Sequence, residues 1–204
     1  MNKICVFDFD GVIANSIEVG YAMHNNIKDK YNLPLVSSKN DYLEVIDNSH
    51  INNRLNDKVS DYYKECNDYY RKRIKDIRLY PRIKELLLEK KKPLYIISSS
   101  PEEFLKEILE REDIKDAIIY GKGKIKTKRD RFEILLKEHK LSKEDILYVG
   151  DTIDDYNFCT SVGIPMLGSN YGYSNLESIK DKLYGLKSSE EKLIETIKPF
   201  MLIK

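Results

Sequence analysis

The chain has 204 residues, which is enough for one α/β core and leaves room for a small accessory domain. With 35 basic and 34 acidic side chains the formal net charge is +1, so there is no large field of one sign to hold a nucleic acid polymer or an anionic membrane. No apolar run approaches the ~18 residues of a membrane span, and the N-terminus lacks the ~7 to 15 apolar residues of a signal peptide. The three cysteines show neither paired spacing nor clustering with histidines. We therefore expect a soluble, cytoplasmic protein without disulfides or zinc, whose partner is a small molecule.

Five short apolar runs predict β-strands, at residues 4–7, 94–97, 117–120, 146–149 and 164–167. The runs are continuously apolar rather than alternating, which is typical of parallel strands buried on both faces. Helical patterns lie between and after them, at residues 83–90, 102–110, 131–139, 154–162, 176–183 and 190–197. Strands that alternate with helices predict a doubly wound, Rossmann-like α/β fold around a parallel sheet.

Residues 16–79 lack a comparable strand signal, and we interpret them as a small helical domain inserted after the first strand, with the core formed by residues 1–15 and 80–204. Within the insertion, tyrosine and aliphatic side chains recur at three- and four-residue steps: Val59, Tyr62, Tyr63, Cys66, Tyr69, Tyr70, Ile74 and Ile77. This spacing predicts one buried face of a long helix.

Polar clusters follow three of the predicted strands, where open α/β sheets bind their ligands. Asp8-Phe9-Asp10-Gly11 follows the first strand, a run of three serines follows the second, and Gly150-Asp151 follows the fourth. Alternate residues of an extended segment face opposite sides, so Asp8 and Asp10 are expected to share one face. Carboxylates that converge from two strand ends repel one another unless a divalent cation lies between them, and ligands that are all oxygen favour Mg²⁺.

These clusters resemble the motifs of the haloacid dehalogenase superfamily. The stretch from Val6 to Ile13 resembles the first motif, Ile97 with the three following serines resembles the second, and Gly150-Asp151 with Asp155 resembles the fourth. Tyr80-Pro81 and the segment from Gly168 to Tyr173 resemble the phosphoglycolate phosphatase-like branch.

The resemblance implies a role for each motif residue. Asp8 is expected to attack phosphorus, Asp10 to act as general acid and base, and Ser98 with a motif lysine to bind phosphoryl oxygens. Two lysines fit the spacing back from Asp151, and Lys128 is preferred over Lys126. The expected ligands of Mg²⁺ are Asp8, the main-chain carbonyl of Asp10, Asp151 and Asp155. Asp155 is also expected to orient the lysine or the waters of the metal. The expected substrate-binding residues are Gly11, Asn15 and Ser99.

The function implied is a Mg²⁺-dependent phosphatase that hydrolyses a small organic phosphomonoester through an aspartyl phosphate. The inserted helical domain corresponds in position to the family's cap, with Ser16, Asn48, His50 and Arg54 as further candidates for contacting substrate. A phosphomutase would need the same aspartates and remains an alternative. A member that only binds a phosphorylated ligand or a protein is a second alternative, and the oligomeric state is open.

Overall fold

The computed structural model describes residues 3–38, 41–42, 55–123 and 127–202. The chain divides into two compact units, one formed by Met1–Asn15 with Leu79–Lys204 and the other by Ser16–Arg78. Within the described residues, no helix has the length and apolar character needed to cross a bilayer.

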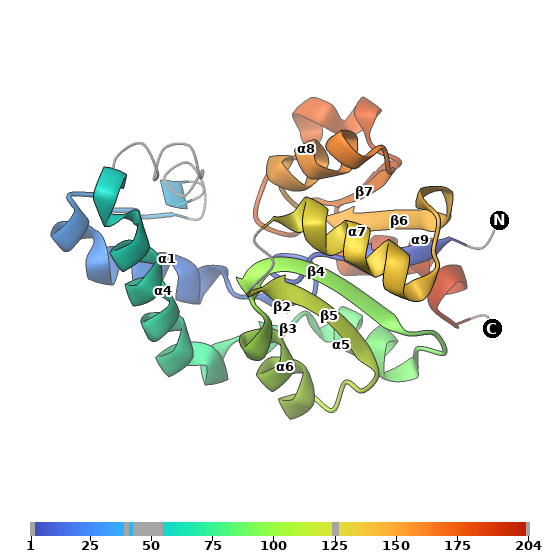
Figure 1. Cartoon of the computed structure of the whole chain (residues 1–204), viewed down its shortest axis with the longest axis horizontal. Helices are drawn as coiled ribbons and strands as arrows, with labels where there is room; N and C mark the ends of the chain where they lie inside the picture. The colour runs from blue at the N-terminus through green and yellow to red at the C-terminus, as the bar shows by residue number, and fades with distance from the viewer. Residues whose placement is uncertain (1–2, 39–40, 43–54, 124–126, 203–204) are drawn as a thin grey trace. The chain divides into compact units, whose positions relative to one another are not determined.

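The first unit is built on a six-stranded parallel sheet in the order β5-β4-β1-β6-β7-β8 (Figure 1). Its strands are β1 (Ile4–Phe7), β4 (Leu94–Pro101), β5 (Ala117–Lys122), β6 (Ile146–Gly150), β7 (Met166–Ser169) and β8 (Gly185–Lys187). The five predicted strands are present, although β7 begins two residues later than the apolar run suggested. The edge strand β8 was not predicted, because its three half-exposed residues carry no buried apolar run.

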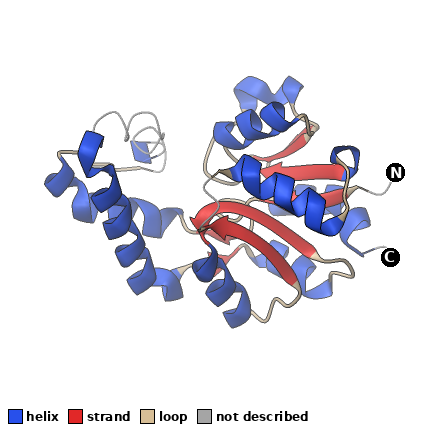
Figure 2. Ribbon diagram, in the orientation of Figure 1, coloured by secondary structure: helices blue, strands red, loops and turns tan. Residues whose placement is uncertain are grey.

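Helices cover both faces of this sheet, which confirms the doubly wound α/β fold (Figure 2). The helices are α5 (Pro81–Glu89), α6 (Glu102–Arg111), α7 (Lys128–His139), α8 (Ile153–Val162) and α9 (Glu190–Leu202). The helix predicted at residues 176–183 is wrong: the segment forms a 3-10 helix over Glu177–Lys182. The segment is short because the chain enters β8 at Gly185, and a short segment gains little from α-helical propagation. Its hydrogen bonds run from i+3 to i instead, as from the Ile179 amide to the Leu176 carbonyl oxygen.

One helix of this unit receives its N-terminal cap from a residue far along the chain. The helix α5 begins with Pro81, which suits the first helical position because its missing amide has no helical partner there. The next backbone amide, that of Arg82, donates to Glu190 Oε2 at 2.7 Å. Glu190 is the first residue of α9, so the N-terminal residue of the last helix caps the N-terminus of α5.

The second unit is helical and has a small core of its own. The α-helices of this unit whose two ends both lie in the described residues are α1 (Ile17–Ile27) and α4 (Val59–Arg73). The predicted tyrosine stripe packs this core: Tyr62 and Cys66 are buried, while Val59, Tyr63, Tyr69 and Tyr70 pack against them half-buried. The long helix ends earlier than predicted, at Arg73, and Ile74–Asp76 continues as a 3-10 turn. Where the chain leaves and re-enters the first unit, the short strands β2 (Ala14–Asn15) and β3 (Arg78–Leu79) form a two-stranded sheet.

Candidate active site

Asp8 follows the strand β1, which is paired on both sides and lies inside the sheet. The backbone amide of Asp8 donates to Val149 O at 2.8 Å and so continues the pairing with β6 for one residue. The side chain is 11% exposed, and its Oδ2 lies 2.9 Å from Lys128 Nζ. Burial raises the pKa of Asp8 to about 7 although Lys128 works in the opposite direction. The carboxylate is thus poorly solvated and depends on nearby positive charge.

Lys128 is the first residue of α7 and lies among the carboxylates of the site. Thr127 caps the helix by accepting the amide of Asp130 at 3.1 Å. The helix dipole disfavours a cation at a helix N-terminus, and two carboxylates near Lys128 offset this cost. Its Nζ lies 2.6 Å from Asp155 Oδ1 and 2.9 Å from Asp8 Oδ2. Burial acts to lower the pKa of Lys128, but these two carboxylates outweigh it and raise the pKa. The other candidate, Lys126, lies outside the described residues.

Asp151 and Asp155 stand at the junction of β6 and α8, and their carboxylates are used differently. Asp155 Oδ2 accepts from the backbone amides of Asp151 and Thr152 and from the Thr152 hydroxyl, at 3.2, 3.1 and 2.7 Å. Burial tends to raise the pKa of Asp155, but Lys128 and the hydrogen bonds from Thr152 outweigh it and lower the pKa. In Asp151, by contrast, Oδ2 accepts the Tyr173 amide at 2.6 Å while Oδ1 is buried without a hydrogen-bond partner.

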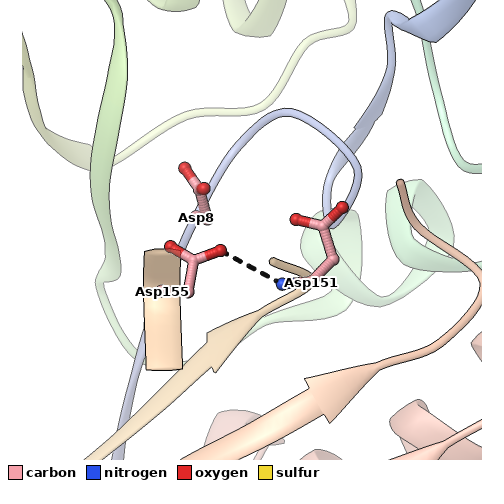
Figure 3. A group of neighbouring side chains, drawn as sticks. All are labelled: Asp8, Asp151 and Asp155. Atoms are coloured by element: carbon pink, nitrogen blue, oxygen red, sulfur yellow. Dashed lines mark hydrogen bonds between the residues drawn. The ribbon is translucent and has the colours of Figure 1, made fainter. Parts of the chain in front are cut away.

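Asp8, Asp151 and Asp155 form a buried group suited to a metal ion (Figure 3). One carboxylate oxygen from each lies within 4.8 Å of the others. Burial raises the pKa of Asp151 well above its usual value, and the charges of Asp155 and Asp8 add to the effect. The orphaned oxygen of Asp151 needs a positive partner, and a donor set made only of oxygens fits a hard divalent cation. Both oxygens of Asp155 accept hydrogen bonds, and so do both oxygens of Asp8, from the Phe9 amide at 2.7 Å and from Lys128. The Oδ1 atom of Asp151 is therefore the ligand atom with no competing hydrogen bond, while Asp155 orients Lys128 and the loop.

The serine run at the end of β4 separates into different environments. The Ser98 side chain is buried and accepts the Ser100 amide at 3.1 Å, whereas Ser99 is exposed. The Ser100 hydroxyl donates to Asp10 Oδ2 at 2.6 Å, so the Asp10 carboxylate is engaged with β4. Ser98 and Ser99 were the predicted site residues of this run, and Ser100 was not. Alternate residues of an extended chain face the same side, so the pattern that pairs Asp8 with Asp10 also pairs Ser98 with Ser100.

Two glycines let the surrounding loops approach the aspartates. Gly11 has a φ of +78°, and a Cβ there would lie 2.0 Å from Asp151 Oδ2. A Cβ on Gly172 would lie 2.4 Å from the carbonyl oxygen of Gly11 and 2.5 Å from Asp151 Cβ. The segment that carries Gly172 and Tyr173 therefore forms part of the site, because it contacts Asp151 directly.

The remaining sequence candidates are not among the residues of the contacts given above, or lie outside the described residues. Asn15 is exposed in β2, and Ser16 is buried at the start of the second unit. Asn48, His50 and Arg54 fall outside the described residues.

Comparison with known proteins identifies the family. A model of the haloacid dehalogenase-like hydrolases matches residues 5–169, so the chain belongs to that family, as its motifs predicted. The phosphoglycolate phosphatase of Photorhabdus laumondii is 31% identical over 110 residues, which are 50% of this chain and 47% of that protein. The phosphoglycolate phosphatase of Vibrio cholerae is 32% identical over 109 residues, which are 50% of this chain and 48% of that protein. The chain spans about half the length of these relatives in the matched regions.

The fold is also that of solved family members. A haloacid dehalogenase-like hydrolase from Streptococcus pneumoniae superposes with a TM-score of 0.81 at 21% identity, over 96% of this chain and 98% of the other. At this identity the likeness shows the shared fold.

Proposed function

We propose that this protein is a Mg²⁺-dependent phosphatase that hydrolyses a small organic phosphomonoester through an aspartyl phosphate on Asp8. The observation that carries the proposal is the set of contacts around Asp8. Its buried carboxylate contacts the Lys128 ammonium at 2.9 Å and lies in one group with Asp151, whose Oδ1 is buried and unpaired. A nucleophile, a phosphate-binding cation and a free metal ligand therefore meet at one point. The phosphoglycolate phosphatases among the relatives support the same reaction class.

In the first half of the reaction, an oxygen of Asp8 attacks phosphorus and the bond from phosphorus to the ester oxygen breaks. Asp10 gives its proton to the departing oxygen. The Ser100 hydroxyl donates to Asp10 Oδ2 and so holds the Asp10 carboxyl beside β4. Ser98, in the serine run of β4, and Lys128, at the start of α7, bind the phosphoryl oxygens.

In the second half, Asp10 takes a proton from a water molecule whose oxygen attacks phosphorus. The bond between phosphorus and Asp8 breaks, which releases inorganic phosphate and restores the carboxylate. Lys128 stays within reach of Asp8 in both halves and offsets its charge. Asp8 and Asp151 would hold Mg²⁺, which when bound supplies positive charge against the phosphoryl oxygens.

Substrate choice is assigned to the unit Ser16–Arg78, which we propose as a helical cap domain. The chain leaves the catalytic unit a few residues after Asp10 and returns at Leu79, which is where an insertion can carry substrate contacts without disturbing the sheet. Phosphoglycolate is the first substrate to test, because the relatives are named for it.

The test is phosphate release from phosphoglycolate, sugar phosphates, nucleoside monophosphates and p-nitrophenyl phosphate, with and without Mg²⁺. Asp8→Asn is the blank, and Asp181→Asn is the matched control because Asp181 is exposed on the 3-10 helix. We expect release that requires Mg²⁺, is abolished in Asp8→Asn and is kept in Asp181→Asn. Rearrangement of a sugar phosphate without release would replace the phosphatase by a mutase, and turnover by Asp8→Asn equal to the unmodified protein would overturn the mechanism.

A further inference from the structure

The hydroxyl of Tyr148 lies at the centre of the polar network, although Tyr148 belongs to a strand whose sequence reads as an apolar run. Tyr148 is on β6, is 0% exposed, and packs its ring edge-on against Phe158 with centroids 5.2 Å apart. Its hydroxyl lies 3.2 Å from Lys128 Nζ and 3.2 Å from Asp155 Oδ1. It also lies 3.1 Å from the carbonyl oxygen of Ile97, the residue before Ser98. One oxygen atom thus connects β4, α7 and α8.

The Tyr148 hydroxyl is one of three acceptors around the Lys128 ammonium. The Lys128 ammonium has three N–H groups. Asp8 Oδ2, Asp155 Oδ1 and the Tyr148 oxygen each lie within hydrogen-bond distance of it. The first two are charged and Tyr148 is neutral. A bound phosphoryl oxygen would take the N–H that Asp8 Oδ2 accepts here, while Asp155 and the neutral Tyr148 hydroxyl keep the other two in place. The hydroxyl can then donate its own hydrogen to Ile97 O, which joins the lysine to the strand that carries Ser98.

A phenylalanine in place of Tyr148 would fill the same space but would leave one N–H of a buried ammonium without an acceptor, and buried unpaired donors are costly.

We propose that Tyr148 is a positioning residue for the phosphate site, whose hydroxyl directs the Lys128 ammonium toward Asp8 and ties it to the backbone beside Ser98. The proposal rests on the phosphatase function given above. It assigns Tyr148 no contact with substrate. Its effect on phosphate passes through Lys128.

A double-mutant cycle on the affinity for inorganic phosphate, measured by calorimetry with Mg²⁺ present, tests this. We expect Tyr148→Phe to weaken phosphate binding about tenfold, as for one hydrogen bond to a charged group, when Lys128 is present. In the Lys128→Met background the same change should leave the phosphate Kd unaltered. Tyr120→Phe is the matched control: Tyr120 is a buried tyrosine on β5 whose hydroxyl lies 2.5 Å from Glu138, so its loss should lower stability without altering phosphate binding.

The outcomes separate this role from the function on which it rests. An unchanged phosphate Kd in Tyr148→Phe, or an equal loss with and without Lys128, overturns the positioning role while leaving the phosphatase intact. Absence of both phosphate binding and turnover in the unmodified protein would overturn the proposed function itself. Thermal unfolding of Tyr148→Phe beside Tyr120→Phe shows whether any loss merely follows a loss of folded protein.

Discussion

Ser100→Ala should impair catalysis in a way that depends on the leaving group. The Ser100 hydroxyl donates to Asp10 Oδ2 at 2.6 Å, a length typical of a hydroxyl bound to an ionised carboxylate. Such a bond contributes about 1.5–3 kcal/mol. At about 1.36 kcal/mol for each factor of ten, complete loss of that contribution in the transition state would lower kcat/KM by about 10- to 160-fold.

The assay compares an alkyl phosphate with p-nitrophenyl phosphate. An alkoxide must be protonated as it departs, whereas p-nitrophenolate departs readily without an acid. If Ser100 acts by orienting Asp10, Ser100→Ala should lose about tenfold or more on the alkyl ester and clearly less on the nitrophenyl ester. Ser142→Ala is the matched control, because the Ser142 hydroxyl also donates to a carboxylate, Asp145 Oδ2 at 3.0 Å, but lies before β6 rather than after it.

Equal losses on the two esters would refute this reasoning, because they would place the effect on phosphate binding or on the nucleophile. Unchanged kinetics on both would show that the 2.6 Å contact has no part in the reaction.

Three further predictions concern other parts of the molecule. Gly172→Ala should weaken Mg²⁺ binding by about tenfold or more in calorimetry, because its Cβ would lie 2.5 Å from Asp151 Cβ and displace that ligand. Glu190→Ala should lower the free energy of unfolding by about 0.5–2 kcal/mol in urea, since it removes the cap of α5, whereas Glu195→Ala on the exposed side of α9 should not. Burial lowers the pKa of His24, so the unfolded chain binds the proton first and thermal stability should fall as the pH drops below about 6.5. His24→Gln, which keeps an N–H donor, should flatten that dependence.

Each of these has a contrary result. Unaltered Mg²⁺ affinity in Gly172→Ala would mean that the loop moves without disturbing Asp151. Equal stability losses in the two glutamate variants would remove the case for capping. A pH dependence that persists in His24→Gln would assign it to other groups.

The aspartates of the site could be predicted from the sequence because the patterns that mark them are local. A continuous apolar run predicts a buried parallel strand, and parallel strands deliver the residues that follow them to one edge of the sheet. Asp8 and Asp151 could therefore be expected to meet although they are far apart in the chain, and the structure brings them together. The spacing back from Asp151 left two candidates for the motif lysine, Lys128 and Lys126, and the structure places Lys128 beside Asp8.

Other features had no local signal. Tyr148 reads as one more apolar strand residue, and its role depends on which carbonyl, ammonium and carboxylate the sheet order brings to its hydroxyl. Glu190 caps a helix that begins more than a hundred positions earlier.

What the sequence by itself determined was the doubly wound fold, the family and the strand ends that carry the aspartates, because periodicity and motifs are properties of short segments. Only the tertiary structure decided how the hydroxyls, amides and charges at those ends pair with one another. A hydrogen bond depends on distances of a few tenths of an ångström and on burial, and both arise only after strands β4, β1 and β6 lie side by side.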